Sequence, residues 1–206
     1  MASATLRRTG TKGVPRAERE QQILDESTRL FGLNTFAGTS VAQIAEAAGI
    51  SKPLIYSYFG SKEGLFAACV EHHGALLADE IERIARGDSV GLIRGLNTLQ
   101  GIFALLEPNP LTWRIFFDAT APSDPSLDAA KNAYAQRITT LADEGVREML
   151  TLNGVTDELD ISALTSVWMS IVDSLVNWWL DHPDQSPEDM TARCARLFLA
   201  VAPGAL

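Results

Sequence analysis

The residues best placed to make chemical contacts lie in a short helix that the sequence predicts from Ser51 onward. Ile55 and Phe59 are four residues apart, so both point to the same, inward side of this helix. The residues left on its outer face are Lys52, Pro53, Tyr56 and Ser57. A short second helix that exposes such a face is typical of the recognition helix of a helix-turn-helix, which enters the major groove of DNA.

A preceding helix and a tight turn are predicted to position this face. Ser40 and Gln43 have the spacing of a capping box. The apolar residues that follow recur with the period of a helix and are Val41, Ile44, Ala45 and Ala48. Gly49 permits a tight turn, Ser51 is a suitable N-cap, and Pro53 is tolerated in the first turn of the second helix.

The stretch TSVAQIAEAAGISKPLIYSYFGSKEGLF resembles the DNA-binding signature of the TetR/AcrR family of bacterial transcriptional regulators. The matching residues are Thr39, Ile44-Ala45, Ala48-Gly49-Ile50-Ser51, Ile55-Tyr56, Tyr58-Phe59, Ser61-Lys62-Glu63 and Leu65. The resemblance implies an all-α fold, with an N-terminal three-helix helix-turn-helix domain and a C-terminal six-helix domain for ligand binding and dimerisation.

The resemblance also implies which residues contact DNA. Lys52, Pro53 and Leu54 match positions that meet base edges, where a lysine can donate to guanine. The remaining expected contacts, mostly to phosphates, are Thr39, Ser40, Ser51, Tyr56, Ser57, Tyr58 and Lys62. Two alternatives stay open: Tyr58 packs beside Phe59 instead, and Thr39 and Ser40 act as helix caps.

The distribution of charge favours a DNA-binding N-terminal part. The net charge is −9, but residues 1–62 hold eight Lys and Arg against five Asp and Glu, a net charge of +3. The remainder holds nine against twenty-one, a net charge of −12. A cationic end on an acidic body suits binding to a polyanion in one orientation.

The composition indicates a folded protein of the cytoplasm. The N-terminus lacks the apolar core of a signal peptide, and no uninterrupted apolar run is long enough to predict a membrane span. Cys69 and Cys194 are isolated thiols, for which a disulfide is not expected in a reducing compartment.

Three regions are predicted along the chain. Residues 1–14 form a disordered basic arm, in which Arg7, Arg8 and Lys12 either reach DNA or only solvate the tail. Residues 15–62 form the helix-turn-helix domain, and residues 63–206 form the effector-binding and dimerisation domain.

Helices are predicted over about 15–33, 61–86, 89–107, 111–120, 125–153, 160–182 and 186–202, besides the two of the helix-turn-helix. Asn34 is expected to end the first of them in the left-handed conformation, and Gly154 to follow the end of the long helix in the same way. Ser61, Asp124 and Asp160 are expected to open the helices that begin at them.

An effector cavity is expected in the C-terminal domain by resemblance, since such pockets are mostly apolar with a few placed polar groups. The candidate residues are Asn97, Phe103, Trp113, Phe116, Phe117, Trp168, Asp173 and Asn177. The alternative is that the aromatic residues are ordinary core. Asp173 requires either a partner or a pocket, because a buried carboxylate is costly when unpaired.

The function predicted is a ligand-responsive transcriptional regulator, foremost a repressor. It binds a palindromic operator as a homodimer through the two C-terminal helices, and a small apolar or aromatic effector releases it. The alternatives are a small-molecule-binding helical protein or enzyme, or a ligand-independent activator or global regulator. No cofactor or metal site is expected, because His72 and His73 are adjacent and diverge, and no phosphate-binding loop or nucleophile motif is present.

Overall fold

The computed structural model describes residues 14–201, which fold into nine α-helices without a strand. The all-α prediction is therefore confirmed, whereas the predicted arm with Arg7, Arg8 and Lys12 lies outside the described residues. The helices are α1 (Arg16–Gly38), α2 (Val41–Ala47), α3 (Lys52–Phe59), α4 (Lys62–Ala85), α5 (Gly91–Leu106), α6 (Thr112–Phe116), α7 (Pro125–Leu152), α8 (Glu158–Leu180) and α9 (Pro187–Val201).

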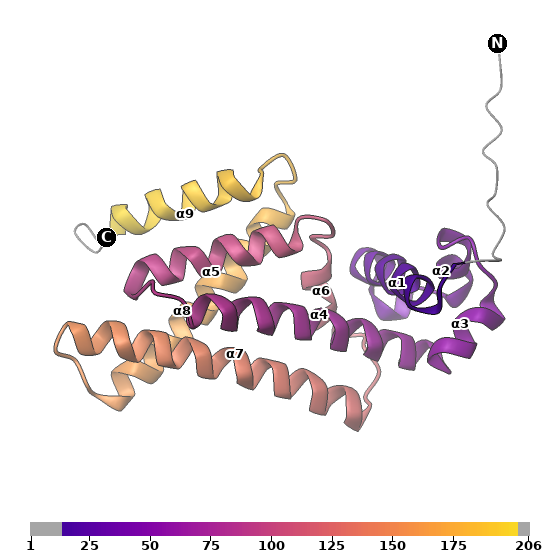
Figure 1. The fold of residues 1–206 in the computed structure, drawn as a ribbon, viewed down its shortest axis with the longest axis horizontal. Coiled ribbons are helices and arrows are strands. Elements are labelled where there is room, and N and C mark those ends of the chain that lie inside the picture. The colour runs from indigo at the N-terminus through magenta and orange to yellow at the C-terminus, as the bar shows by residue number, and fades with distance from the viewer. Residues whose placement is uncertain (1–13, 202–206) are drawn as a thin grey trace, which may run out of the picture.

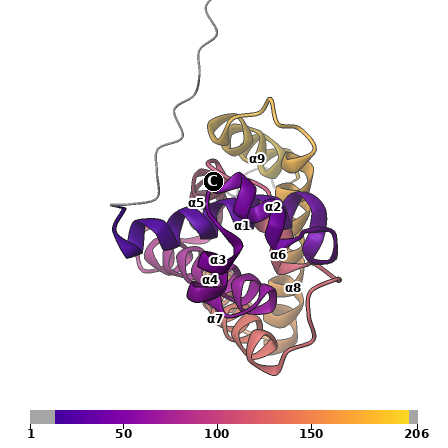
Figure 2. The ribbon, with the colours of Figure 1, turned by 90° about the vertical axis from the view of Figure 1, so that its right-hand side faces the viewer.

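Helix α4 connects the two ends of the molecule. Helices α1, α2 and α3 gather at one end, and α4 begins beside α3 and continues into the body, where it lies against α5 and α7 (Figure 1). Seen from that end, α1 to α3 lie in front of the body, while α8 and α9 lie on one flank of it (Figure 2). The N-terminal three-helix unit is thus joined to the body by a continuous helix.

Two hydrophobic cores divide the packing, and α4 contributes to both. The first contains Ile23, Ile44, Ile55 and Phe66, and it extends along α4 as far as Val70. The second core begins at Leu77 on the same helix and contains apolar residues of α5, α8 and α9, among them Phe103, Val176 and Cys194. One core therefore gives way to the other inside α4, between Val70 and Leu77. The division into domains 15–62 and 63–206 stays a prediction.

Several predicted helix ends are present in the structure. The Ser61 hydroxyl accepts the amide hydrogen bond of Gly64 at 2.9 Å, which caps α4. The Asp124 carboxylate caps α7 by accepting from the amide of Leu127 at 3.1 Å. Gly154 has φ 76°, the left-handed conformation expected after the end of α7. These local signals act within one turn of helix and do not depend on distant packing.

Two predicted ends are wrong, and that of α1 is displaced only slightly. Helix α1 is broken at Thr35, whose φ of 66° and ψ of 168° are non-helical, so its first part ends beside the predicted Leu33 and a further turn runs to Gly38; the positive φ falls on Thr35, not on Asn34. Helix α6 spans only Thr112–Phe116, shorter than predicted. Helix α8 begins at Glu158, because the Asp157 carboxylate accepts from the amide of Leu159 at 2.7 Å and takes the N-cap role predicted for Asp160.

Two glycines allow close approaches between helices. A Cβ on Gly32 of α1 would lie 2.4 Å from the carbonyl oxygen of Leu111, and one on Gly74 of α4 would lie 2.6 Å from the Tyr134 ring. The close α1–α6 and α4–α7 contacts therefore require that positions 32 and 74 carry no side chain.

Candidate nucleic-acid interface and effector cavity

The turn between α2 and α3 has the geometry that the sequence predicted. The Gln43 amide donates to the Ser40 hydroxyl at 3.3 Å, and the Ser40 amide donates to the Gln43 side-chain oxygen at 2.8 Å. Gly49 has φ 65°, and the Ile50 amide then donates to the carbonyl of Ala45 at 2.9 Å. This turn fixes the direction in which α3 leaves α2.

Helix α3 buries one side and exposes the other. Ile55 is fully buried, whereas Lys52, Pro53 and Ser57 are exposed and the Tyr56 side chain is 46% exposed. Ser51 holds the N-cap position, but its hydroxyl makes no capping hydrogen bond, unlike that of Ser40. The Ser57 hydroxyl donates to the carbonyl of Leu54 at 2.7 Å, so the exposed face offers the Lys52 ammonium and the Ser51 and Tyr56 hydroxyls as donors that the fold does not use.

Thr39 does not fit a contact with DNA. It is 2% exposed, and its hydroxyl donates to the carbonyls of Leu30 at 3.1 Å and Thr35 at 2.8 Å. The structure therefore corrects this prediction and gives Thr39 the capping role that was its alternative. Ser40 caps α2 and is also exposed, so its contact with a phosphate stays a prediction.

Leu54, Tyr58 and Lys62 are partly buried. The Tyr58 ring lies 5.9 Å from that of Phe59, so the packing role is present, and the phosphate contact stays a prediction. The Lys62 ammonium lies 4.1 Å from the centroid of the Phe36 ring, a cation–π geometry that holds it at the start of α4. Free amides at that helix end add positive potential beside α3.

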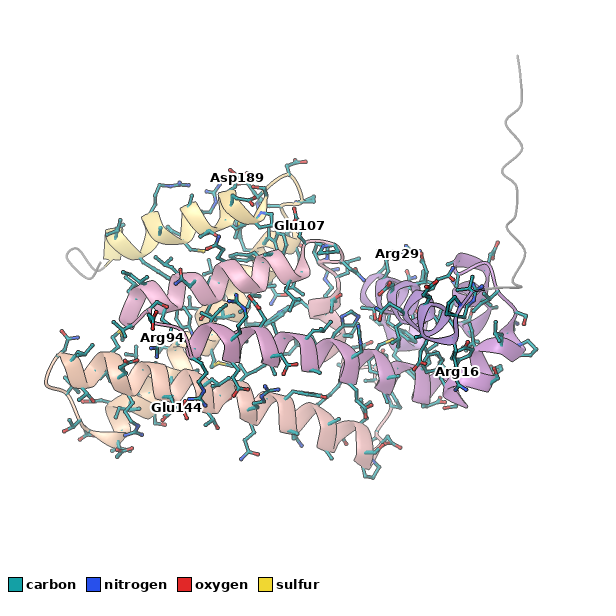
Figure 3. The ribbon with its side chains drawn as sticks, viewed as in Figure 1. Arg16, Arg29, Arg94, Glu107, Glu144 and Asp189 are labelled. Atoms are coloured by element: carbon teal, nitrogen blue, oxygen red, sulfur yellow. The ribbon has the colours of Figure 1, made fainter. Side chains whose placement is uncertain are left out.

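Arg16 is a cation near this face that the sequence analysis did not select. It is exposed, and its guanidinium carbon lies 5.2 Å from the centroid of the Tyr58 ring (Figure 3). The only sequence signal for it was the positive charge of residues 1–62, because its position beside α3 depends on how α1 packs.

The second candidate site is a cavity of about 920 Å³ in the body. Helices α4 to α8 line it, with Phe198 of α9 at one side. A volume near the upper end of the range for small-molecule sites, which is about 300–1,000 Å³, fits a ligand of moderate size. Most of the surface of its lining is apolar.

Five of the eight predicted effector residues line this cavity: Trp113, Phe116, Phe117, Trp168 and Asp173. Three do not, and these predictions are corrected. Asn97 and Asn177 are exposed outside the lining, and Phe103 is fully buried against the Trp179 ring at 5.3 Å. Helical spacing alone could not distinguish the side of α5 that faces the core from the side that faces the cavity.

Asp173 has both of the features that the sequence required, a partner and a pocket. Its Oδ1 atom accepts from the Trp113 indole nitrogen at 3.0 Å and from the Asn177 amide at 2.9 Å. The carboxylate also forms part of the cavity wall, beside the aromatic side chains of α6. These bonds fix its position without neutralising its charge.

The sequence analysis missed the cations of the lining, Arg94 and Lys131. The Arg94 guanidinium lies 2.5 Å from the Glu148 carboxylate and donates to the Ser89 carbonyl at 2.6 Å (Figure 3). Burial lowers the pKa of Lys131, and the nearby carboxylates of Asp118 and Asp128 oppose that shift. No local motif marks these residues, because several helices assemble the lining.

A short segment connects the cavity wall to the N-terminal helices. Phe117, in the lining, is followed by Asp118, whose Oδ2 atom accepts from the amide of Phe36 at 2.5 Å. The Thr120 hydroxyl accepts from the amide of Ala37 at 3.0 Å. The end of α1, just before the helix-turn-helix, is thus held by the residues that follow α6.

Sequence comparisons point to one family. Residues 23–69 match the family described as bacterial regulatory proteins, tetR family. The chain is 26% identical over 126 residues to the HTH-type transcriptional activator FasR of Mycolicibacterium smegmatis, a match that covers 61% of this chain and 58% of FasR. It is 28% identical over 148 residues to the HTH-type transcriptional repressor AcnR of Corynebacterium efficiens, covering 70% of this chain and 69% of AcnR.

The fold is also shared with solved regulators. The structure of FadR from Bacillus subtilis in complex with stearoyl-CoA has a TM-score of 0.70 at 17% identity, over 89% of this chain and 98% of that one. At this identity the likeness shows the fold alone. The predicted three-helix and six-helix organisation is therefore confirmed as a fold.

Proposed function

Since the chain belongs to the TetR family of bacterial regulatory proteins, we propose that it is a ligand-responsive transcriptional repressor. It binds a palindromic operator in the cytoplasm as a homodimer, and a small-molecule effector in the body releases it. The observation that carries this proposal is the exposed face of α3, whose Lys52, Tyr56 and Ser51 donors have no structural task.

The electrostatic arrangement supports DNA as the partner of this face. Lys52 and Arg16 are exposed, and the cationic end of α4 with Lys62 lies next to them in the fold. Each Lys or Arg that neutralises a phosphate releases counterions, so the affinity should fall steeply with salt. The net charge of −12 beyond residue 62 disfavours binding through the body.

Two connections support an effector that acts on the DNA-binding helices. Helix α4 contributes Gly74, Leu77 and Ile81 to the cavity lining and has its N-terminus beside α3. The α6 segment joins the lining to Phe36 through Asp118. A ligand that favours another arrangement of α4 and α6 would weaken operator binding, and by linkage the operator would weaken ligand binding by the same factor.

Exposed apolar side chains on α8 and α9 support the homodimer. They are Leu159, Val167, Trp178, Leu197 and Leu199, each between 38% and 80% exposed. Helix α8 is also long and apolar enough to span a membrane, with a mean hydropathy of 1.4 and 22% of its most apolar window buried. We assign this surface to a second subunit and not to a membrane. Asp173 belongs to α8 and accepts a hydrogen bond from Trp113, and a carboxylate is costly within a bilayer.

A second candidate is an activator on the same DNA. The relative FasR is described as an activator and AcnR as a repressor, and the sign of regulation depends on where the operator lies. A small-molecule-binding protein or enzyme with an idle N-terminal domain is disfavoured by these relatives, both named as regulators of transcription.

The test is selection of bound sequences from random DNA duplexes by the full-length protein. The expected result is a palindromic consensus whose binding constant falls with a steep log–log dependence on salt. No enrichment at low salt would contradict the proposal. Placing the selected operator inside or upstream of a reporter promoter, with the protein present or absent, then separates repression from activation.

A further inference from the structure

The charges that line the cavity are not equally compensated. Arg94 is paired with Glu148 at 2.5 Å. Lys131 forms no ion pair among the described residues: its ammonium lies 5.6 Å from the centroid of the Phe66 ring, and the carboxylates of Asp118 and Asp128 act on it from farther away. Of the two cations of the lining, only Arg94 is therefore neutralised by a direct ion pair.

Asp173 is the acidic side chain of the lining, and it has no ion-pair partner among the described residues. Its two hydrogen-bond donors, the Trp113 indole and the Asn177 amide, are neutral. Within the part of the chain that the structure describes, no Lys, Arg or His nitrogen lies within ion-pair distance of this carboxylate. Only Oδ1 accepts these bonds, so Oδ2 is available to a group in the cavity.

Trp113 contacts this carboxylate, and further aromatic rings line the same cavity. The Trp113 ring lies 5.5 Å from that of Phe117 and 6.5 Å from that of Phe116, and Trp168 lines the same cavity from α8. A cation over such ring faces is attracted by their quadrupoles, most strongly where water is excluded. A carboxylate beside aromatic faces is the combination that recognises protonated and quaternary amines.

We propose that the effector of this cavity is an amphiphilic cation, whose amine or quaternary ammonium group binds at Asp173 and whose apolar body fills the cavity. The proposal rests on the function proposed above for the cavity and names its ligand class. The ligand's charge offsets that of Asp173, which has no cationic partner in the unliganded protein. An anionic ligand of the same size would instead place a like charge near Asp173 or have to compete with the carboxylates beside Arg94 and Lys131.

The test compares three probes that share one chain length: dodecyltrimethylammonium, 1-dodecanol and dodecanoate. Each is titrated below its micelle concentration into the full-length protein, and binding is followed by the fluorescence of Trp113 and Trp168. The ammonium probe is expected to bind at least tenfold more tightly than the alcohol, and dodecanoate more weakly than either.

The matched variants are Asp173→Asn and Asp160→Asn, the second at an exposed carboxylate of the same helix outside the lining. Asp173→Asn keeps an oxygen that accepts from Trp113 and Asn177 but removes the charge, so the preference for the ammonium probe should disappear. Asp160→Asn should leave that preference unchanged. If Asp173→Asn does not fold, the ranking of the three probes on the natural protein decides the question alone.

The outcomes separate the ligand class from the effector function. If the alcohol or dodecanoate binds as tightly as the ammonium probe, the cation assignment is overturned while the cavity stays a binding site. If no probe binds, the cation assignment is overturned too. If the ammonium probe binds at Asp173 without changing operator affinity, the ligand class holds and the effector function fails.

Discussion

At the scale of single residues, Tyr56 is the hydroxyl donor of α3 whose role in DNA binding is most separable from folding. Its side chain is 46% exposed, and its hydroxyl makes no hydrogen bond to another of the described residues. We expect Tyr56→Phe to weaken operator binding about 3- to 30-fold, the loss of one hydrogen bond to a charged phosphate, without lowering the melting temperature. A gel shift on the selected operator measures the first effect and thermal unfolding the second.

The control for this prediction is Tyr134→Phe, a tyrosine of α7 in the body that is remote from α3. It should leave operator affinity unchanged. An unaltered affinity of Tyr56→Phe would mean that the Tyr56 hydroxyl does not contact the phosphate backbone.

Thr35 is a second residue at which the local backbone leads to a prediction. It has φ 66° and ψ 168°, a conformation that a β-branched residue adopts only at a cost. Thr35→Gly should raise the free energy of unfolding by about 1 kcal/mol, since relief of strain exceeds the added entropy of the unfolded chain. Denaturant unfolding measures this, with Thr35→Ala as the matched control that keeps the strain.

The break in α1 falls at Thr35 and not at Asn34, for a reason that is not local. The TetR resemblance leads one to expect a glycine just before the aromatic residue, and this chain has Thr35 before Phe36. The prediction gave the unusual conformation to Asn34, which tolerates it better. The structure instead fixes Thr35 through distant contacts, because Phe36 and Ala37 donate to Asp118 and Thr120 across more than eighty residues of chain.

At the scale of helices, the Asp118 contact predicts how α6 stabilises the end of α1. The carboxylate accepts from the amide of Phe36 and from the amide and hydroxyl of Thr120. Asp118→Ala should therefore destabilise the protein by about 1–3 kcal/mol, as removal of a charged acceptor does. Hydrogen exchange measures this effect. We expect faster exchange at the Phe36 and Ala37 amides and unchanged exchange in α8.

His73 links the stability of the α1–α4 packing to pH. Its Nε2 atom lies 3.0 Å from the Thr28 hydroxyl of α1, and burial, aided by the charge of His72, lowers its pKa to about 4 while Asp25 opposes the shift. The unfolded chain, with an ordinary pKa near 6.5, takes up a proton first as the pH falls. The stability that depends on neutral His73 is thus complete above about pH 6.5 and is lost as the pH falls toward 4.

The expected loss is on the order of 1–2 kcal/mol, which allows for the partial exposure of the ring. The measurement is the free energy of unfolding of the natural protein and of His73→Gln between pH 7 and pH 4. The variant should lose less stability over this interval. Parallel curves for the two proteins would show that His73 is not the group responsible.

The helices were predictable from the sequence to the extent that their signals are local. Ser61, Asp124 and Gly154 mark helix ends by bonds or backbone angles within one turn, and the structure has all three. At the start of α8 the sequence offers two suitable aspartates, Asp157 and Asp160, and the structure has Asp157 as the N-cap, with φ −70° and ψ 125°. Short, irregular elements such as α6 are fixed by tertiary contacts and were the least predictable.

At the scale of the whole molecule, the two candidate sites likewise differ in how well the sequence predicted them, according to whether one helix or several form the site. The exposed face of α3 lies on one short helix, so helical periodicity predicted Lys52 and Tyr56 correctly as exposed. The cavity is built from five helices, and Arg94 and Lys131 enter it only through their packing. Phe103, an aromatic residue at suitable spacing, was for the same reason placed in the cavity when it lies in the core.

The exposed apolar surface of α8 and α9 gives the prediction about assembly. Leu197 on α9 is 49% exposed, and α8 and α9 lie on one flank of the molecule (Figure 2). In a two-fold dimer this residue would lie at or near the contact with the partner subunit, where a charge would be buried without a partner. We expect Leu197→Glu to shift the dimer toward single subunits at micromolar concentration in sedimentation velocity.

The same variant tests why the operator should be palindromic. Two recognition helices reach successive major grooves only when a dimer holds them about one turn of DNA apart. Leu197→Glu should therefore reduce affinity for the full operator more than for a half-site, while α-helix content is retained. Leu76→Glu, at a leucine of α4 that is 42% exposed, is the matched control and should leave both mass and affinity unchanged. A single-subunit mass for the natural protein would instead require that one recognition helix suffices, and the selected sequences would then lack two-fold symmetry.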